Sequence, residues 1–190
     1  MIKALIFLIN TFSQLYMLLL LMRFWLPALR ANFQNPIAQG VLRYTSPLVI
    51  PVRRFVPPIR RLDTATVLVA FVIQFAVLLV ISALQSIGRG ADPLSSISGS
   101  NVMLRFAVSA FVELAMLSVT LFIVAIAIRV ILNWMGRYMG PISDMLTDLT
   151  EPLIRPIRRV IPPLGVLDLS VYVTVILLIA LNIMLADLLP

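Results

Sequence analysis

Residues 45–58 read TSPLVIPVRRFVPP, and residues 150–163 read TEPLIRPIRRVIPP, 105 positions further along the chain. The alignment needs no gap. Ten of its 19 positions from 45 to 63 are identical, and these include four prolines and two adjacent arginines. Self-similarity at one fixed spacing is the signature of an internal repeat. We therefore predict that the chain contains the same structural unit twice.

Four apolar runs flank the two motifs, at about residues 4–26, 64–87, 102–132 and 166–189. Each is long enough to cross a bilayer as a helix, which takes roughly 20 residues. The composition agrees, because 61% of the residues are hydrophobic and 12% are charged, whereas soluble domains have about 45–50% and about 25%. All four runs are predicted transmembrane helices. A cleaved secretory signal is the alternative for the first run, but that run exceeds the usual apolar signal core of about 7–15 residues.

The predicted fold is an all-α membrane protein built from two parallel repeats. Residues 1–90 form the first repeat, residues 91–101 a short extracytoplasmic connector, and residues 102–190 the second repeat. Each repeat contains a span, an Arg/Pro loop and another span, with the loops at 27–61 and 133–165. Since each copy crosses the membrane an even number of times, both copies have the same orientation.

Basic residues are distributed unevenly between the two sides of the membrane. The two loops hold ten arginines, whereas the opposite side holds Lys3, Arg89 and Arg105. Cytoplasmic loops carry the excess of Lys and Arg. We therefore predict that both loops are cytoplasmic and that both termini lie outside.

Short amphipathic helices are predicted within the loops, lying in the membrane interface. Two sites place a capping residue before a helix-starting proline, and a third resembles them with one residue inserted: Asn35-Pro36, Ser46-Pro47 and Thr150-Glu151-Pro152. Such pairs are typical of helix starts. We therefore expect short helices to begin at these positions.

Apolar and acidic side chains give two further expectations for the loops. From Pro141, apolar residues recur at helical spacing on one face, which suits a helix lying in the interface: Ile142, Met145, Leu146 and Leu149. Asp63 and Asp168 stand at the N-terminal ends of the second spans of the two repeats. A carboxylate there is expected to cap the first turn and to face the positive end of the helix dipole.

The repeated motif resembles that of the YggT family of bacterial and plastid membrane proteins, whose unit is a Pro-Leu-x2-Pro-x-Arg-Arg-x2-Pro core with a following aspartate. This chain shows the core twice, at Pro47, Leu48, Pro51, Arg53, Arg54, Pro57 and Asp63, and at Pro152, Leu153, Pro156, Arg158, Arg159, Pro162 and Asp168. The likeness extends to Asn35-Pro36, Arg23 and Trp25. It implies a helper or organiser of other components in the bacterial inner membrane. Relatives are linked to osmotic or potassium homeostasis, to cell division and nucleoid placement, and to cofactor assembly on a plastid cytochrome complex.

The arginines of the two motifs are the candidate binding residues: Arg53, Arg54, Arg60, Arg61, Arg155, Arg158 and Arg159. A guanidinium fork suits bidentate binding of phosphate, so anionic lipid headgroups or unidentified membrane proteins are the expected partners. The alternative is that these arginines only fix the topology. Direct binding of nucleic acid is not expected, because no row of stacking aromatics accompanies the arginines.

Polar residues within the spans form a second candidate group: Glu113, Gln14 and Gln74. A carboxylate at that depth is costly unless it is paired or protonated, so we expect a cluster that joins helices or lines a cation path. A cation path would make the chain a channel or channel modulator, and four helices supply a pore only in a homo-oligomer. Arg23 and Arg129 lie near the loop-side ends of their spans and are expected to extend into the interface.

The chain contains no cysteine and no histidine. This composition removes the thiol nucleophile, the imidazole base and the usual ligands of zinc, haem and iron–sulfur clusters. The sequence also lacks a phosphate-binding glycine loop and a plausible pair of catalytic carboxylates. We therefore expect no enzymatic activity, no catalytic residue, no metal and no cofactor.

Overall fold

The structure is a computed structural model that describes residues 2–31, 34–58, 62–93, 99, 101–136, 140–161 and 168–189. These residues form six helices, four of them long and apolar enough to span a membrane: α1 (Ile2–Ala28), α3 (Thr64–Gly88), α4 (Val102–Trp134) and α6 (Leu169–Ala186). The predicted all-α class and the four spans are confirmed. Three predicted motif residues lie outside the described ranges: Arg60, Arg61 and Pro162.

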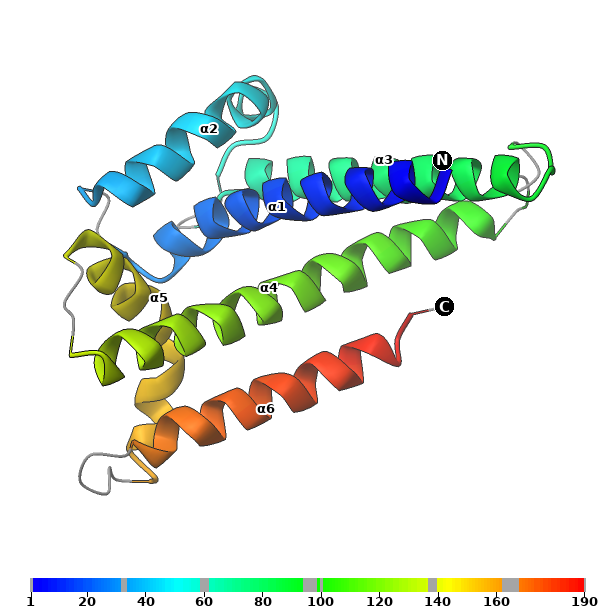
Figure 1. Ribbon diagram of the computed structural model, residues 1–190. Coiled ribbons are helices and arrows are strands. Elements are labelled where there is room, and N and C mark those ends of the chain that lie inside the picture. The colour runs from blue at the N-terminus through cyan, green and yellow to red at the C-terminus, as the bar shows by residue number, and fades with distance from the viewer. Residues whose placement is uncertain are drawn as a thin grey trace.

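The spans form a bundle in which α4 packs against each of the other three (Figure 1). α1 lies beside α3, and α6 packs on the far side of α4. Both chain ends lie at one end of the bundle, and the two loop helices lie at the other. Alanines are buried on two of the spans, Ala65 and Ala70 on α3 and Ala110 and Ala125 on α4. Small residues let membrane helices approach closely, so packing here rests on close contact between helices.

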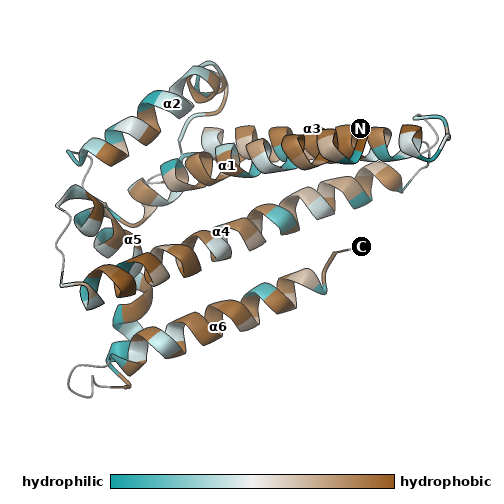
Figure 2. Ribbon diagram, viewed as in Figure 1, coloured by the Kyte–Doolittle hydropathy of each residue, from teal (hydrophilic) through white to brown (hydrophobic). Residues whose placement is uncertain are grey.

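The four spans consist mostly of hydrophobic residues (Figure 2), and many large hydrophobic side chains lie on the outer surface of the bundle. Large side chains such as Phe7, Phe12 and Ile176 are about two-thirds exposed. In water such a surface would drive aggregation, whereas lipid tails solvate it without cost. The chain is therefore a membrane protein, as its four apolar helices indicate.

The two loop helices are α2 (Pro36–Arg53) and α5 (Pro141–Arg158). Asn35 caps α2 as expected, because its Oδ1 accepts a hydrogen bond from the Ile37 amide at 2.9 Å. α5 follows Gly140, whose positive φ of 53° is a conformation that L residues rarely adopt. Each helix thus begins at a position that its local sequence specifies.

The helix starts predicted at Ser46-Pro47 and Thr150-Glu151-Pro152 are wrong, because both motifs lie inside a continuous helix. α2 and α5 each contain two internal prolines four residues apart. A proline inside a helix leaves one carbonyl without its amide donor. These prolines are exposed, so the freed carbonyls lie on the outer face, where water or headgroups can satisfy them.

The apolar face of α5 packs against the spans. Met145, Leu146 and Leu149 are buried, whereas Ile142 is exposed. Leu146 and Leu149 belong to a core cluster with α4 and α6 residues that include Ile126 and Leu178. The amphipathic pattern that suggested a lipid-facing helix therefore serves mainly to hold α5 on the bundle.

The two loop helices meet at their first turns. The Asn35 side chain donates from Nδ2 to the Pro141 carbonyl at 2.6 Å. From this point α2 and α5 run away from each other across the loop-side end of the bundle (Figure 1). The two loop helices therefore meet near their first turns and diverge from there.

Candidate functional site

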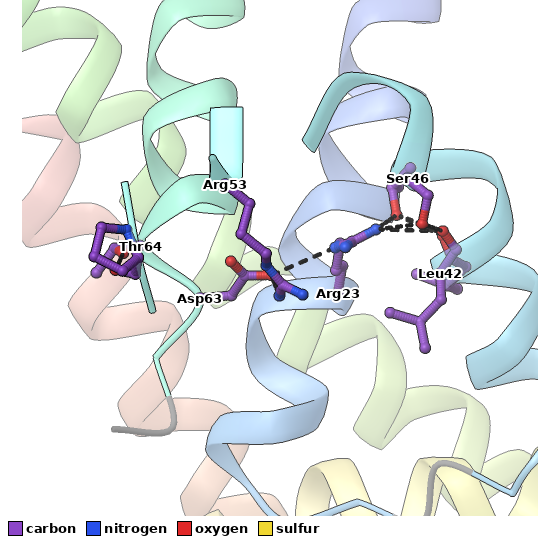
Figure 3. A network of polar contacts seen from close by, with 9 residues as sticks. Arg23, Leu42, Ser46, Arg53, Asp63 and Thr64 are labelled. Carbon is purple, nitrogen blue, oxygen red and sulfur yellow. Dashed lines mark hydrogen bonds and ion pairs between the residues drawn. The ribbon is translucent and has the colours of Figure 1, made fainter. Parts of the chain in front are cut away.

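Arg23, near the end of α1, turns inward onto α2. Its side chain is only 4% exposed. Its Nη1 donates to three oxygens of α2: Thr45 Oγ1 at 2.9 Å, Ser46 Oγ at 3.1 Å and the Leu42 carbonyl at 3.3 Å (Figure 3). The expectation that Arg23 extends into the interface is therefore wrong, because α2 supplies a ready set of acceptors beside it.

Asp63 supplies the negative charge of this cluster. Its Oδ2 lies 2.6 Å from Arg53 Nη2 and 3.5 Å from Arg23 Nε (Figure 3). The expected cap of α3 by this carboxylate is not made; the Asp63 carbonyl accepts from the Thr66 amide instead. Arg23, Thr45, Arg53 and Asp63 form what we call the first clamp, in which two guanidinium groups share one carboxylate.

The second repeat builds the same arrangement, which we call the second clamp. Arg129 donates to Thr150 Oγ1 at 2.8 Å and pairs with Glu151 at 2.8 Å. Arg158 pairs with Glu151 at 3.0 Å and with Asp168 at 2.6 Å. Arg129, like Arg23, therefore bonds inward and does not extend into the interface. Two guanidinium groups here meet two carboxylates.

Asp168 also caps α6, as expected, by accepting a hydrogen bond from the Ser170 amide at 3.1 Å. Burial alone would raise the pKa of Asp168, but hydrogen bonds from Arg158 and Ser170 outweigh it and lower that pKa below its ordinary value. The carboxylate is therefore charged at neutral pH, as an ion pair requires.

Each clamp joins three elements at the loop-side end of the bundle. The first connects the end of α1, the middle and end of α2, and the start of α3; the second does the same for α4, α5 and α6. A clamp therefore fixes the position of a loop helix on its pair of spans. Its contacts are ion pairs and hydrogen bonds between side chains of different helices, so its evident effect is to hold these helices together.

The gapless alignment of the repeats does not by itself reveal the threonines and the span arginines of the clamps. Thr45 and Thr150 are identical positions in that alignment, but neither was singled out as functional. Arg23 and Arg129 are 106 residues apart, one position out of step with the 105-residue repeat. Both arginines were predicted near the loop-side ends of their spans, but as interface residues, because the acceptors on the loop helices are not evident from the sequence around each arginine.

The described arginines of the two motifs that take no part in a clamp lie on the outer surface. Arg54, Arg155 and Arg159 are exposed, and within the described residues none of them makes a side-chain hydrogen bond or ion pair. Phe55 and Val160, the residues that follow the two pairs, are 85% and 81% exposed. Each loop helix therefore ends in a basic group with an apolar side chain beside it.

The predicted polar group within the spans is reduced to a pair. Gln74 on α3 donates from Nε2 to Glu113 Oε2 on α4. Gln14 is exposed and bonds Asn10 on its own helix at 3.4 Å. The Glu113–Gln74 bond therefore connects the two repeats inside the membrane, and Gln14 takes no part in it.

Comparison with known proteins agrees with this architecture. The model of the CCB3/YggT family matches residues 2–84 and 108–189, one segment for each repeat. An uncharacterised protein of Vibrio alginolyticus is 36% identical over 189 residues, covering 95% of this chain and 92% of that protein. The uncharacterised Escherichia coli protein YggT is 30% identical over 187 residues, covering 98% and 92%. No solved structure matches the chain. The chain belongs to the CCB3/YggT family.

Proposed function

We propose that this protein is a non-enzymatic organiser of other components in the bacterial inner membrane. It docks anionic lipid headgroups or partner membrane proteins through the outward arginines of its loop helices, Arg54, Arg155 and Arg159. One observation carries the proposal: each clamp connects a loop helix to its two spans while leaving basic side chains exposed beyond it.

The physical chemistry of these arginines supports the proposal. A guanidinium group presents a planar fork that matches phosphate or carboxylate bidentately. Near an anionic leaflet each basic residue contributes about 1 kcal/mol. Phe55 and Val160 would enter the apolar part of the interface beside the arginines. Topology alone requires the charge but not a clamp that fixes its position.

Sidedness is part of the proposal and has a direct test. The chain has no native cysteine, so single cysteines can be introduced at Gln39 on α2 and Thr147 on α5, both exposed. Both should resist impermeant thiol reagents in intact cells and react after the membrane is opened. Rapid labelling of both would overturn cytoplasmic loops, and labelling of one alone would overturn the parallel repeats.

The recognition test separates charge from geometry. Arg54→Gln with Arg159→Gln should remove most copurifying anionic lipid or partner and abolish complementation of a strain that lacks the protein. Arg54→Lys with Arg159→Lys keeps the charge but loses the fork, so insertion should stay normal while binding falls. Arg89→Gln, an exposed arginine at the opposite end of the bundle, is the matched control. Full complementation by the glutamine variant would refute recognition by these arginines.

Ion conduction is the second candidate function, and the Glu113–Gln74 pair favours it. A polar pair within the spans is costly and is often functional. As a channel or channel modulator, the protein would act in osmotic or potassium homeostasis. Potassium flux through the purified protein in liposomes, abolished by Glu113→Gln, would support this candidate over the organiser. Absence of flux in the unchanged protein would leave the pair as a contact between helices.

A further inference from the structure

A cavity of about 340 Å³ opens between the loop-side ends of α4 and α6. Its apolar lining comes from Ile126, Val130 and Val171. The charged side chains lining it belong to the second clamp: Arg129, Arg158 and Asp168. Three exposed polar or aromatic residues complete it: Asn133, Trp134 and Tyr172. Apolar, charged and aromatic groups thus face one space at the end of two membrane spans.

The charges around this cavity are balanced. Arg129 and Arg158 are both paired with Glu151, and Arg158 is also paired with Asp168. Both guanidinium groups are therefore already compensated, and the set adds up to no net charge. A singly anionic ligand would gain little here, whereas a ligand carrying one positive and one negative group would meet a partner for each.

The aromatic side chains identify the positive group. Trp134 is 68% exposed and Tyr172 is 43% exposed, and both line the cavity with the Asp168 carboxylate. Indole and phenol faces attract ammonium groups, and a carboxylate accepts their N–H donors. Arg129, Arg158 and the Asn133 amide offer N–H groups to phosphate oxygens. Together they match an ammonium joined to a phosphodiester.

These features are confined to the second repeat. With Arg23 aligned on Arg129, the residues equivalent to Asn133 and Trp134 are Pro27 and Ala28. With Asp63 aligned on Asp168, the residue equivalent to Tyr172 is Val67. The first repeat thus keeps the clamp but has none of the polar and aromatic groups that complete the cavity. The cavity is therefore not a by-product of the clamp.

We propose that this cavity binds the headgroup of one zwitterionic phospholipid of the phosphoethanolamine type. The ammonium lies by Asp168, Trp134 and Tyr172, the phosphate lies by Arg129, Arg158 and Asn133, and the acyl chains run along Ile126 and Val130 between α4 and α6. This site goes beyond the proposed function, because it holds a neutral lipid and uses none of the outward arginines.

Native mass spectrometry of the purified full chain tests the site. The protein is exchanged into detergent with equal amounts of phosphatidylethanolamine and phosphatidylglycerol, and the bound lipids are weighed. One phosphatidylethanolamine should remain bound in preference to phosphatidylglycerol. Trp134→Ala with Tyr172→Val installs the residues of the first repeat and should weaken that binding by about tenfold, since each ring contributes a cation–π contact. Excess soluble glycerophosphoethanolamine should not displace the lipid, because it lacks the chains.

Tyr44→Val is the matched control, since Tyr44 is an exposed aromatic on α2, outside the cavity. It should leave phosphatidylethanolamine binding unchanged. Asn133→Leu is a second cavity variant, and it should weaken binding even if the aromatic double variant proves unstable. Equal retention of the two lipids by the unchanged protein, or unchanged binding in both cavity variants, would overturn the site. Displacement by the soluble headgroup would overturn its assignment to a lipid. Loss of anionic lipid in the Arg54 and Arg159 variants is a separate result and bears only on the proposed function.

Discussion

The two clamps use the same kinds of residue at equivalent positions but differ in burial and charge. In the first clamp, Arg23 is 4% exposed and Asp63 is 7% exposed. In the second clamp, Arg129 is 19% exposed and Asp168 is 28% exposed. The first has two arginines on one carboxylate, whereas the second adds Glu151. The two clamps thus share one arrangement of helices and side chains but compensate their arginine charges differently.

A single aligned position accounts for much of the difference. Ser46 in the first repeat corresponds to Glu151 in the second. The Ser46 hydroxyl accepts a hydrogen bond from Arg23 and donates one to the Leu42 carbonyl, whereas the Glu151 carboxylate bridges Arg129 and Arg158. Without that bridge, Arg23 must approach Asp63 directly and is buried with it. In the buried first clamp, one carboxylate compensates both arginine charges. In the more exposed second clamp, two carboxylates do so.

The largest expected effect comes from removing the carboxylate that the first clamp cannot replace. Asp63→Asn leaves the buried Arg23 without a counter-charge and should cost about 3–5 kcal/mol in the free energy of unfolding. Asp168→Asn should cost only about 1 kcal/mol, because Glu151 remains and the group is partly exposed. Unfolding titrations in mild detergent measure both. Equal losses would break the comparison.

A second carboxylate should partly rescue the first clamp. Ser46→Glu introduces the residue of the second repeat, and in the Asp63→Asn background it should restore about 1–2 kcal/mol through a charged hydrogen bond to Arg23. A double-mutant cycle isolates this interaction. Ser46→Glu alone serves as the reference. No coupling between the two positions would show that the Ser46 site cannot act as Glu151 does.

The threonines should behave alike in both repeats. Thr45 and Thr150 are fully buried, and each accepts from its clamp arginine. Thr45→Val and Thr150→Val keep the shape but lose the acceptor, so each should cost about 1 kcal/mol in the free energy of unfolding. Thr147→Val, at an exposed position on α5, is the control and should change little. A large difference between Thr45 and Thr150 would show that the shared part of the clamps is not equivalent.

The smallest expected effect is the dependence of the stability on acidic pH. The pKa of Asp168 is lower in the folded state than its ordinary value of 3.8, so its stabilisation is complete above that value and is lost as the pH falls through the folded pKa. The stability difference between the unchanged protein and Asp168→Asn should stay constant from about pH 7 to about pH 5. It should shrink only below 3.8. A difference that fades well above pH 4 would contradict the ion pair with Arg158.

Much of the fold could be predicted because the bilayer limits the options. In lipid the backbone N–H and C=O groups must bond to each other, and an apolar run of sufficient length does this by forming a helix. The repeated motif then fixed the number of units and their likeness. Helix boundaries inside the loops could not be predicted in the same way, because Ser46-Pro47 has the form of a helix start. Local sequence rules take account of the missing amide hydrogen of Pro47. They do not take account of the tertiary packing that allows α2 to continue beyond this residue.

The site was harder to predict than the spans because its members are far apart in sequence. Arg23 meets Thr45 only once α2 folds back onto α1. Rules for single residues assigned the arginine to the interface and Asp63 to a cap, and both would hold for an isolated helix. The competing partner in each case was a charged or polar group from another helix, which no local pattern displays.

The contact between Asn35 and the Pro141 carbonyl has a consequence for avidity. α2 and α5 each have 18 residues, so each is about 27 Å long at a rise of 1.5 Å per residue. Because they diverge from a shared origin, their basic ends lie at opposite edges of the protein. A single lipid headgroup cannot bridge that distance, so lipids would occupy the two ends independently. A ligand that binds both ends at once must be rigid and broad, as a protein surface is. Only such a ligand would lose much of its binding when one end alone is changed, because the two ends would no longer act together.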